Sequence, residues 1–198
     1  MSCIPMRNRF LAAALLLVCA GAAAGAETGS VSGKVTATPE KYLKDTIVYL
    51  KEVPGNYPPK THSMDQKGME FHPHILMLTV GDTVKFLNSD GVDHNVYSPD
   101  GEAYNLGIFP KGQARDHTFT TKGVYTQLCS VHPEMLAYIF VGQNPYAAAV
   151  KKDGSFKIEN VPAGRYQLAV WNAKLKADEA SVTVATGKTA QSDFSLAR

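Results

Sequence analysis

The stretch "GVYTQLCSVHPEM", Gly123 to Met135, joins a β-strand pattern to three side chains that bind soft or borderline metals. The run up to Cys129 contains Val124, Tyr125 and Thr126, which are residue types common in strands, and this predicts a strand that ends at the cysteine. His132 and Met135 follow at intervals of three residues, and a second strand-like run, "LAYIFVG", begins directly after them. A loop fixed by a strand at each end holds its side chains in a defined geometry. The stretch therefore predicts a metal-binding loop in a β-protein.

The rest of the chain repeats this strand pattern. Short apolar or alternating runs are separated by Gly, Pro, Asn and Asp, and no stretch shows the period of a long helix. Many short strands with turn signals between them are typical of antiparallel sandwiches, so the sequence predicts an all-β protein. The predicted strands lie in "GSVSGKVTA", "DTIVYLKEV", "ILMLTV", "TVKFLN", "RDHTFT", "GVYTQLC", "LAYIFVG", "GSFKIENV", "RYQLAVWN" and "ASVTVAT".

The N-terminus has the three parts of a secretory signal peptide. Arg7 and Arg9 precede an apolar run from Phe10 to Ala20, and a small-residue "AGA" ends at Ala26. Residues 1–26 are therefore predicted to be a signal peptide that is cleaved near Ala26, with the mature protein in the periplasm. A membrane anchor is the alternative, but the apolar run is short for a span and no stop-transfer pattern follows.

Cleavage there would change the cysteine count and the charge. Cys3 and Cys19 leave with the segment, so Cys129 remains alone and no internal disulfide can form. Lipid attachment at Cys19 is an alternative, although Val18 before it is bulkier than such a site prefers. Loss of the segment's two arginines leaves 18 basic and 18 acidic residues. This neutral balance does not indicate a nucleic acid or an anionic membrane as partner.

A fourth donor lies upstream of the loop. His94, in "DHNVYSPD", sits at another predicted strand edge. Two imidazoles, one thiolate and a weak thioether suit copper in both of its oxidation states. Taken singly, Cys129 could be a small buried residue, Met135 core filler and His132 a surface imidazole. All three alternatives would have to hold at once with this spacing, so copper binding is favoured.

The segment from Phe71 to Val141 resembles a cupredoxin of the amicyanin and plastocyanin type. "PHILMLTVGDTVKFLNSDGVDHNVYS" is similar to the strand pair that delivers the first histidine, and Cys-x-x-His-Pro-x-Met is the short ligand loop of amicyanins. The resemblance implies a Greek-key β-sandwich that holds one copper ion, Cu(I) or Cu(II). It also implies Asn95 as an outer residue that ties the ligand loops together by hydrogen bonds. The implied copper ligands are His94, Cys129, His132 and Met135.

The two flanks resemble the two halves of another domain. "GSVSGKVTATPEKYLKDTIVYLKEV", Gly29 to Val53, and "DGSFKIENVPAGRY", Asp153 to Tyr166, are similar to parts of a transthyretin-like, carboxypeptidase regulatory-like domain. Neither half alone closes a sandwich, and the ends of a domain commonly lie close together. We therefore predict residues 27–56 and 144–198 to form one small β-sandwich, with a cupredoxin inserted at 57–143. Methylamine-utilisation proteins have a similar arrangement. One larger sandwich is the alternative.

Electron transfer is the function that the predicted set of four metal donors favours. Four protein donors leave no open position on the metal, and neither a Ser-His-Asp nor a paired-carboxylate arrangement emerges, so the chain is not expected to be an enzyme. His132 is the expected exit for the electron, towards a small and transient partner interface. The resemblance to amicyanins suggests a dehydrogenase or a c-type cytochrome as partner.

Two other functions remain open from the sequence. The first is copper storage, delivery or resistance, with His72, His74 and scattered methionines (Met64, Met69 and Met77) as additional donors. The histidines of "FHPH" are, however, better explained by a surface or structural role. The second is a structural protein whose metal site has lost its role, against which the intact ligand set argues.

Overall fold

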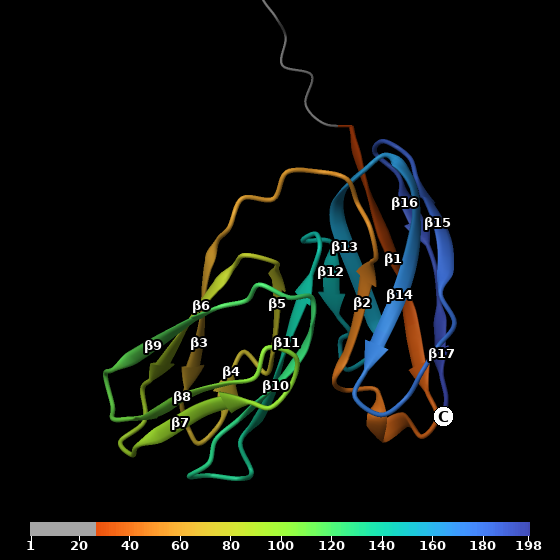
Figure 1. Cartoon of the computed structure of the whole chain (residues 1–198). Coiled ribbons are helices and arrows are strands. Elements are labelled where there is room, and N and C mark those ends of the chain that lie inside the picture. Colours follow the sequence, from red (N-terminus) through yellow and green to blue (C-terminus); the bar gives the residue numbers. More distant parts are fainter. Residues whose placement is uncertain (1–26) are drawn as a thin grey trace, which may run out of the picture.

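The computed structural model describes residues 27–198, and the predicted signal peptide, 1–26, lies outside the described residues. The described residues form seventeen β-strands and one short 3-10 helix, η1 (Glu40–Tyr42), arranged as two β-sandwiches (Figure 1). The prediction of an all-β protein is confirmed. Within residues 27–198, no helix is long and apolar enough to cross a bilayer.

The first sandwich contains the predicted metal loop. One of its sheets has the strand order β5-β11-β10-β7-β8, and the other has the order β4-β3-β6-β9. The strands of the first sheet are β5 (Ile75–Thr79), β11 (Leu136–Gly142), β10 (Gly123–Leu128), β7 (His94–Ser98) and β8 (Tyr104–Phe109). Those of the second are β4 (Phe71–His72), β3 (Thr61–Gln66), β6 (Thr83–Asn88) and β9 (Ala114–Thr118).

Alternation along these strands builds the core of the first sandwich. Val84 and Phe86 of β6 are fully buried, whereas Lys85 between them is exposed. This period of two is what a half-buried strand requires. The same core includes Cys129 and Met135, 2% and 1% exposed, so two of the predicted donors belong to the packed interior.

The second sandwich is built from strands near both ends of the described chain. One sheet has the order β13-β1-β16, with β17 also paired to β1, and the other has the order β12-β2-β14-β15. The strands of the first are β1 (Thr28–Ala37), β13 (Ser155–Pro162), β16 (Thr189–Gln191) and β17 (Phe194–Leu196). Those of the second are β12 (Ala147–Ala149), β2 (Thr46–Leu50), β14 (Gly164–Asn172) and β15 (Ala180–Val184).

Pairing across the long gap in sequence closes this second sandwich. β1 runs antiparallel to β13, and β2 runs antiparallel to both β12 and β14. The side chain of Asn144, 3% exposed, donates to the carbonyl of Leu50 at 3.0 Å. Asp153 and Gly154 form a turn, since Gly154 has φ 83° and the Asp153 carboxylate accepts from the N–H of Ser155 at 3.0 Å.

A third apolar layer lies between the sandwiches. Four buried apolar residues belong to neither core: Ile47, Tyr138, Phe140 and Ala169. They lie on facing surfaces of β2 and β14 on one side and of β11 on the other. Ring pairs join these surfaces, with centroids 4.7 Å apart for Tyr49 and Phe140 and 5.1 Å apart for Tyr138 and Trp171. The second sandwich therefore covers the outer side of β11.

Several strands were absent from the sequence prediction, most clearly β3 and β8. In β3, "THSMDQ", Met64 is the one large apolar residue, and its buried neighbour in the pattern is the polar Gln66. β8 is an edge strand in which Phe109 alone is fully buried. Neither segment has the alternating apolar pattern on which strand prediction depends.

Candidate metal centre

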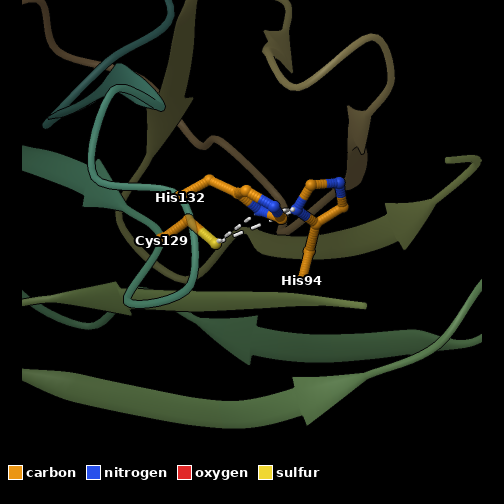
Figure 2. Close-up of side chains that lie close together, drawn as sticks. All are labelled: His94, Cys129 and His132. Carbon is orange, nitrogen blue, oxygen red and sulfur yellow. Dashed lines mark hydrogen bonds between the residues drawn. The ribbon is translucent and has the colours of Figure 1, made fainter. Parts of the chain in front are cut away.

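Three of the predicted ligands converge on one point of the first sandwich. Nδ1 of His94 lies 3.8 Å from Sγ of Cys129, and Nδ1 of His132 lies 3.9 Å from the same sulfur. The two Nδ1 atoms are 3.0 Å apart. Figure 2 shows both imidazole rings directed towards the sulfur. Within residues 27–198 this is the one group of three or more His, Cys, Asp or Glu side chains whose ligand atoms all lie within 4.8 Å of one another.

Neighbouring strands of one sheet position these three side chains. His94 is the first residue of β7, and Cys129 follows the last residue of β10. β7 and β10 pair directly in antiparallel orientation, with Tyr97 opposite Leu128. The start of β7 and the end of β10 therefore lie at the same end of the sheet. His132 lies in the loop between β10 and β11, whose ends are held together by the pair of Leu128 and Leu136. The sheet thus fixes both histidines relative to the sulfur.

Met135 completes the loop from within the core. Its side chain is 1% exposed and belongs to the same apolar cluster as Cys129. Its backbone N–H donates to the carbonyl of His132 at 3.0 Å, which closes the loop into a tight turn. The side chain of Met135 therefore lies inside the sandwich, in the same core as Cys129.

Asn95 links both segments that carry the donors. Its backbone N–H donates to Sγ of Cys129 at 3.3 Å, and its side-chain oxygen accepts from the N–H of Ser130 at 3.2 Å. Its side-chain nitrogen donates to Oδ1 of Asn105 at 2.8 Å and to the carbonyl of Gly107 at 3.0 Å. Because Asn95 is buried, each of these bonds is protected from competition with water. The residue ties the ligand loop to β8.

A hydrogen-bonded loop in front of His94 was not recognised in the sequence. Asn88 is buried, and its side chain donates to the carbonyls of Val92 and Phe109 at 2.9 and 3.0 Å. Its oxygen accepts from the N–H of Asp90 at 2.9 Å. Asp90 Oδ2 in turn lies 2.8 Å from Nε2 of His94. The segment "NSDG", with Asn88 at the end of β6 and Asp90 two residues later, was the available signal for such a structured turn.

The other histidines do not join the site. His72 contacts the carbonyl of Lys67 through Nε2 at 3.0 Å, whereas His74 contacts Oδ1 of Asp45 at 2.6 Å. The two rings thus have separate partners and do not converge on one point. His62 forms a hydrogen bond with the buried Asp82, 2.9 Å between Nε2 and Oδ2.

The donor set at the converging point fits copper. One sulfur and two imidazole nitrogens, supplied by buried or half-buried side chains, are the trigonal set of electron-transfer copper sites, in which a thioether is the weak fourth ligand. The convergence contains no carboxylate, which would favour a harder ion.

Comparison with known proteins agrees with this geometry. Residues 59–142 match the family described as copper binding proteins, plastocyanin/azurin family. This segment is a cupredoxin domain. Its family binds one copper ion, and the donors of this chain suit that ion.

Individual relatives of the cupredoxin domain include amicyanins. Amicyanin from Paracoccus denitrificans is 35% identical over 82 residues, which cover 39% of this chain and 63% of the relative, so the match spans less than two thirds of that protein. A solved structure of a reduced amicyanin mutant is 32% identical and covers 41% of this chain and 81% of its own, with a TM-score of 0.39. A purple cupredoxin from Nitrosopumilus maritimus is 28% identical, covering 40% and 98%, with a TM-score of 0.37.

The second sandwich has a match of its own. Residues 141–192 match the family described as polysaccharide lyase family 4, domain II. This agrees with a second β-sandwich domain beside the cupredoxin domain. The carboxypeptidase regulatory-like character of the flanks and the boundaries at residues 56 and 143 stay predictions.

Proposed function

We propose that this chain is a type 1 copper protein that carries single electrons between transient redox partners in the periplasm, rather than an enzyme. The observation that carries the proposal is the convergence of the Nδ1 atoms of His94 and His132 on Sγ of Cys129. Bound copper would supply the one-electron chemistry, with His94, Cys129, His132 and Met135 as its ligands. With all four positions taken by protein, no position is open for a substrate.

The packing around the donors supports rapid one-electron exchange. His94 and Cys129 are buried, and both are held by hydrogen bonds: the Asp90 carboxylate accepts from Nε2 of His94, and the N–H of Asn95 donates to Sγ of Cys129. Outer partners of this kind fix the orientation of a ligand ring and limit its rearrangement when the charge of the site changes. His132 is the least buried of the three donors. It therefore provides the exit for the electron.

The surface around His132 supports docking of another protein. Five large apolar side chains in residues 27–198 are exposed: Met69, Val92, Ile108, Val131 and Leu136. Each is linked to a residue of the metal centre by sequence, strand pairing or a hydrogen bond. Val131 and Leu136 flank the ligand loop, and Ile108 lies opposite Asn95 in the sheet. Met69 donates its N–H to Asp90, and Val92 lies in the loop before His94. Gathering of exposed apolar residues at one place is typical of an interaction site.

The arrangement of the remaining histidines does not favour copper storage or delivery. His72 and His74 face separate partners, Lys67 and Asp45, and Met64 is fully buried in the core. These side chains therefore provide no second convergence of donors for copper.

A visible spectrum of the copper-loaded protein, combined with a redox titration, tests the proposal. A type 1 site gives intense thiolate-to-copper absorption that bleaches on reduction and returns on oxidation. Tight copper binding without this reversible colour would instead support the copper-handling function. Comparison of the whole-cell and periplasmic fractions tests the location.

A further inference from the structure

A hollow between the two sandwiches is lined by lysines. Its volume is about 480 Å³, and its walls come from the η1 region, from the segment after β12 and from the start of β5. Lys41, Lys44, Lys151 and Lys152 contribute to the walls, together with His74 of the cupredoxin domain. Both domains are therefore needed to form it.

The hollow lies at the end of the molecule that carries the metal centre. Ile75, in its wall, pairs with Tyr138, three residues after Met135. On the other side, Asn172 at the end of β14 donates to the carbonyl of Tyr42 at 2.7 Å, which holds η1 at that same end. Figure 1 shows η1 and the loop between β10 and β11 both at the lower end of the view.

The charge of the hollow is predominantly positive. All four lysines are exposed, and none forms an ion pair within residues 27–198. The acidic groups in the wall are Glu40 and Asp45, and Asp45 is engaged by His74, 2.6 Å between Oδ1 and Nε2.

The two domains also differ in net charge, in the same sense. Residues 57–143 carry 6 Lys or Arg and 9 Asp or Glu, whereas residues 27–56 and 144–198 together carry 12 and 9. Glu70, Asp93 and Glu134 are exposed near the metal centre. An acidic surface would therefore be repelled by the cupredoxin domain and attracted to the lysines beside it.

We propose that the lysine-lined hollow docks an acidic redox protein, so that the partner rests on both domains with its own redox centre against the apolar surface around His132. This inference rests on the proposed electron-transfer function and names the chemistry of the partner. In the exchange, Cu(I) loses one electron to the partner's oxidised centre, for example a ferric haem, which becomes ferrous. No proton is transferred. The lysines act on the encounter of the two proteins, and the apolar surface acts on their final contact.

Two double variants with the same change in charge distinguish an effect of the hollow from an effect of the overall charge of the domain. Lys44→Glu/Lys152→Glu alters the hollow. Arg165→Glu/Lys188→Glu is the control. It alters two exposed residues at the opposite end of the same sandwich, at the start of β14 and just before β16. The copper(I) form of the full chain is mixed in a stopped-flow instrument with a ferric c-type cytochrome of acidic net charge, and in parallel with one of basic net charge.

We expect the hollow variant to react with the acidic cytochrome about tenfold more slowly at low ionic strength, and the difference to shrink as salt is added. The control variant should change the rate less than about twofold, and the basic cytochrome should not be slowed by the hollow variant. Equal slowing by both variants, or no slowing by the hollow variant, would overturn the proposal. So would lysine-dependent binding to anionic phospholipid vesicles in the absence of an effect on the acidic cytochrome.

A binding measurement that involves no electron transfer tests the docking proposal independently of the redox function. The dissociation constant for a zinc-substituted acidic cytochrome, followed by its fluorescence, should rise about tenfold in the hollow variant. If the copper-loaded protein has no reversible colour change, the electron-transfer function fails, and this measurement still decides whether the hollow binds an acidic protein.

Discussion

Asp90 Oδ2 lies 2.8 Å from Nε2 of His94, on the side of the ring opposite to the nitrogen that faces Cys129. Burial raises the pKa of Asp90, but the N–H groups of Met69 and Gly68 and the contact with His94 outweigh this and lower its pKa to about 2. The carboxylate therefore stays ionised at all ordinary pH values and holds the ring of His94 in one orientation.

Asp90→Asn should destabilise the metal-free protein by about 1–3 kcal/mol near neutral pH, because hydrogen bonds to a charged group are lost. The pKa of Asp90 is lower in the folded than in the unfolded chain, so its ionisation stabilises the fold above about pH 4, and this stabilisation is lost as the pH falls towards 2. Urea unfolding of both proteins across pH 2–7 measures the difference. A difference that stays constant down to pH 2 would contradict the assigned role.

Cys129→Ala should abolish the intense visible absorption and the reversible redox chemistry, even if copper still binds through the histidines, because the thiolate is the origin of both. The absorption spectrum and cyclic voltammetry of the copper-loaded variant provide the measurement. Ser130→Ala, which leaves the backbone N–H bonded to Asn95 in place, is the matched control and should keep the colour. An unchanged spectrum in Cys129→Ala would place the copper elsewhere.

Met135→Leu should retain both copper and colour while the reduction potential rises, because an axial thioether is a weak donor to the oxidised ion and mainly tunes the potential. Leucine also preserves the apolar packing at this buried position, so little stability should be lost. Potentiometric titration against wild type decides the matter. A fall in potential would show that Met135 is not an axial ligand.

Removal of residues 57–143, with a short Gly-rich linker between the flanks, should leave a folded β-sandwich. The ends to be joined are close, since the rings of Tyr57 and Tyr146, beside the two cut points, have centroids 6.2 Å apart. Polar replacements of Ile47 and Trp171 should accompany the deletion, because the cupredoxin domain covers that face. A cooperative thermal transition is expected, and its absence with both designs would count against one domain formed from two segments.

Expression of the full sequence in a Gram-negative host should yield a periplasmic protein whose mass corresponds to a chain that begins at or near Glu27. Replacement of Arg7 and Arg9 by Glu should reduce export, since the basic n-region is then lost. Intact-mass measurement of the periplasmic fraction is the readout. A membrane-bound protein that retains Arg7 would disprove cleavage.

The metal centre was more predictable than much of the fold around it. Copper geometry requires particular donors at particular spacings, so Cys129, His132 and Met135 are visible in one short stretch, and a histidine at a strand edge supplies His94. The carboxylate of Asp90 acts through a contact that depends on how the loop from Asn88 to Asp93 folds back. Such a contact has no fixed spacing in sequence.

The fold was predictable where burial follows alternation and was missed where polar side chains are buried. In β6, Val84 and Phe86 show the period directly, whereas Gln66 in β3 occupies an interior position that sequence patterns assign to apolar residues. The contact between the two sandwiches was equally hidden. Tyr49 and Trp171 occupy the alternate positions of their strands, where a pattern cannot distinguish a solvent-exposed ring from one that meets a second sheet.

The apolar layer formed by Ile47, Tyr138, Phe140 and Ala169 also limits how other molecules can collide with the cupredoxin domain. Tyr138 and Phe140 of β11, in the sheet that holds Cys129, are buried against the second sandwich, so other molecules cannot reach that part of the sheet. A larger fraction of the remaining approaches ends near His132. The second sandwich thereby acts as a shield that reduces futile collisions, and it does so without contributing a ligand to the metal.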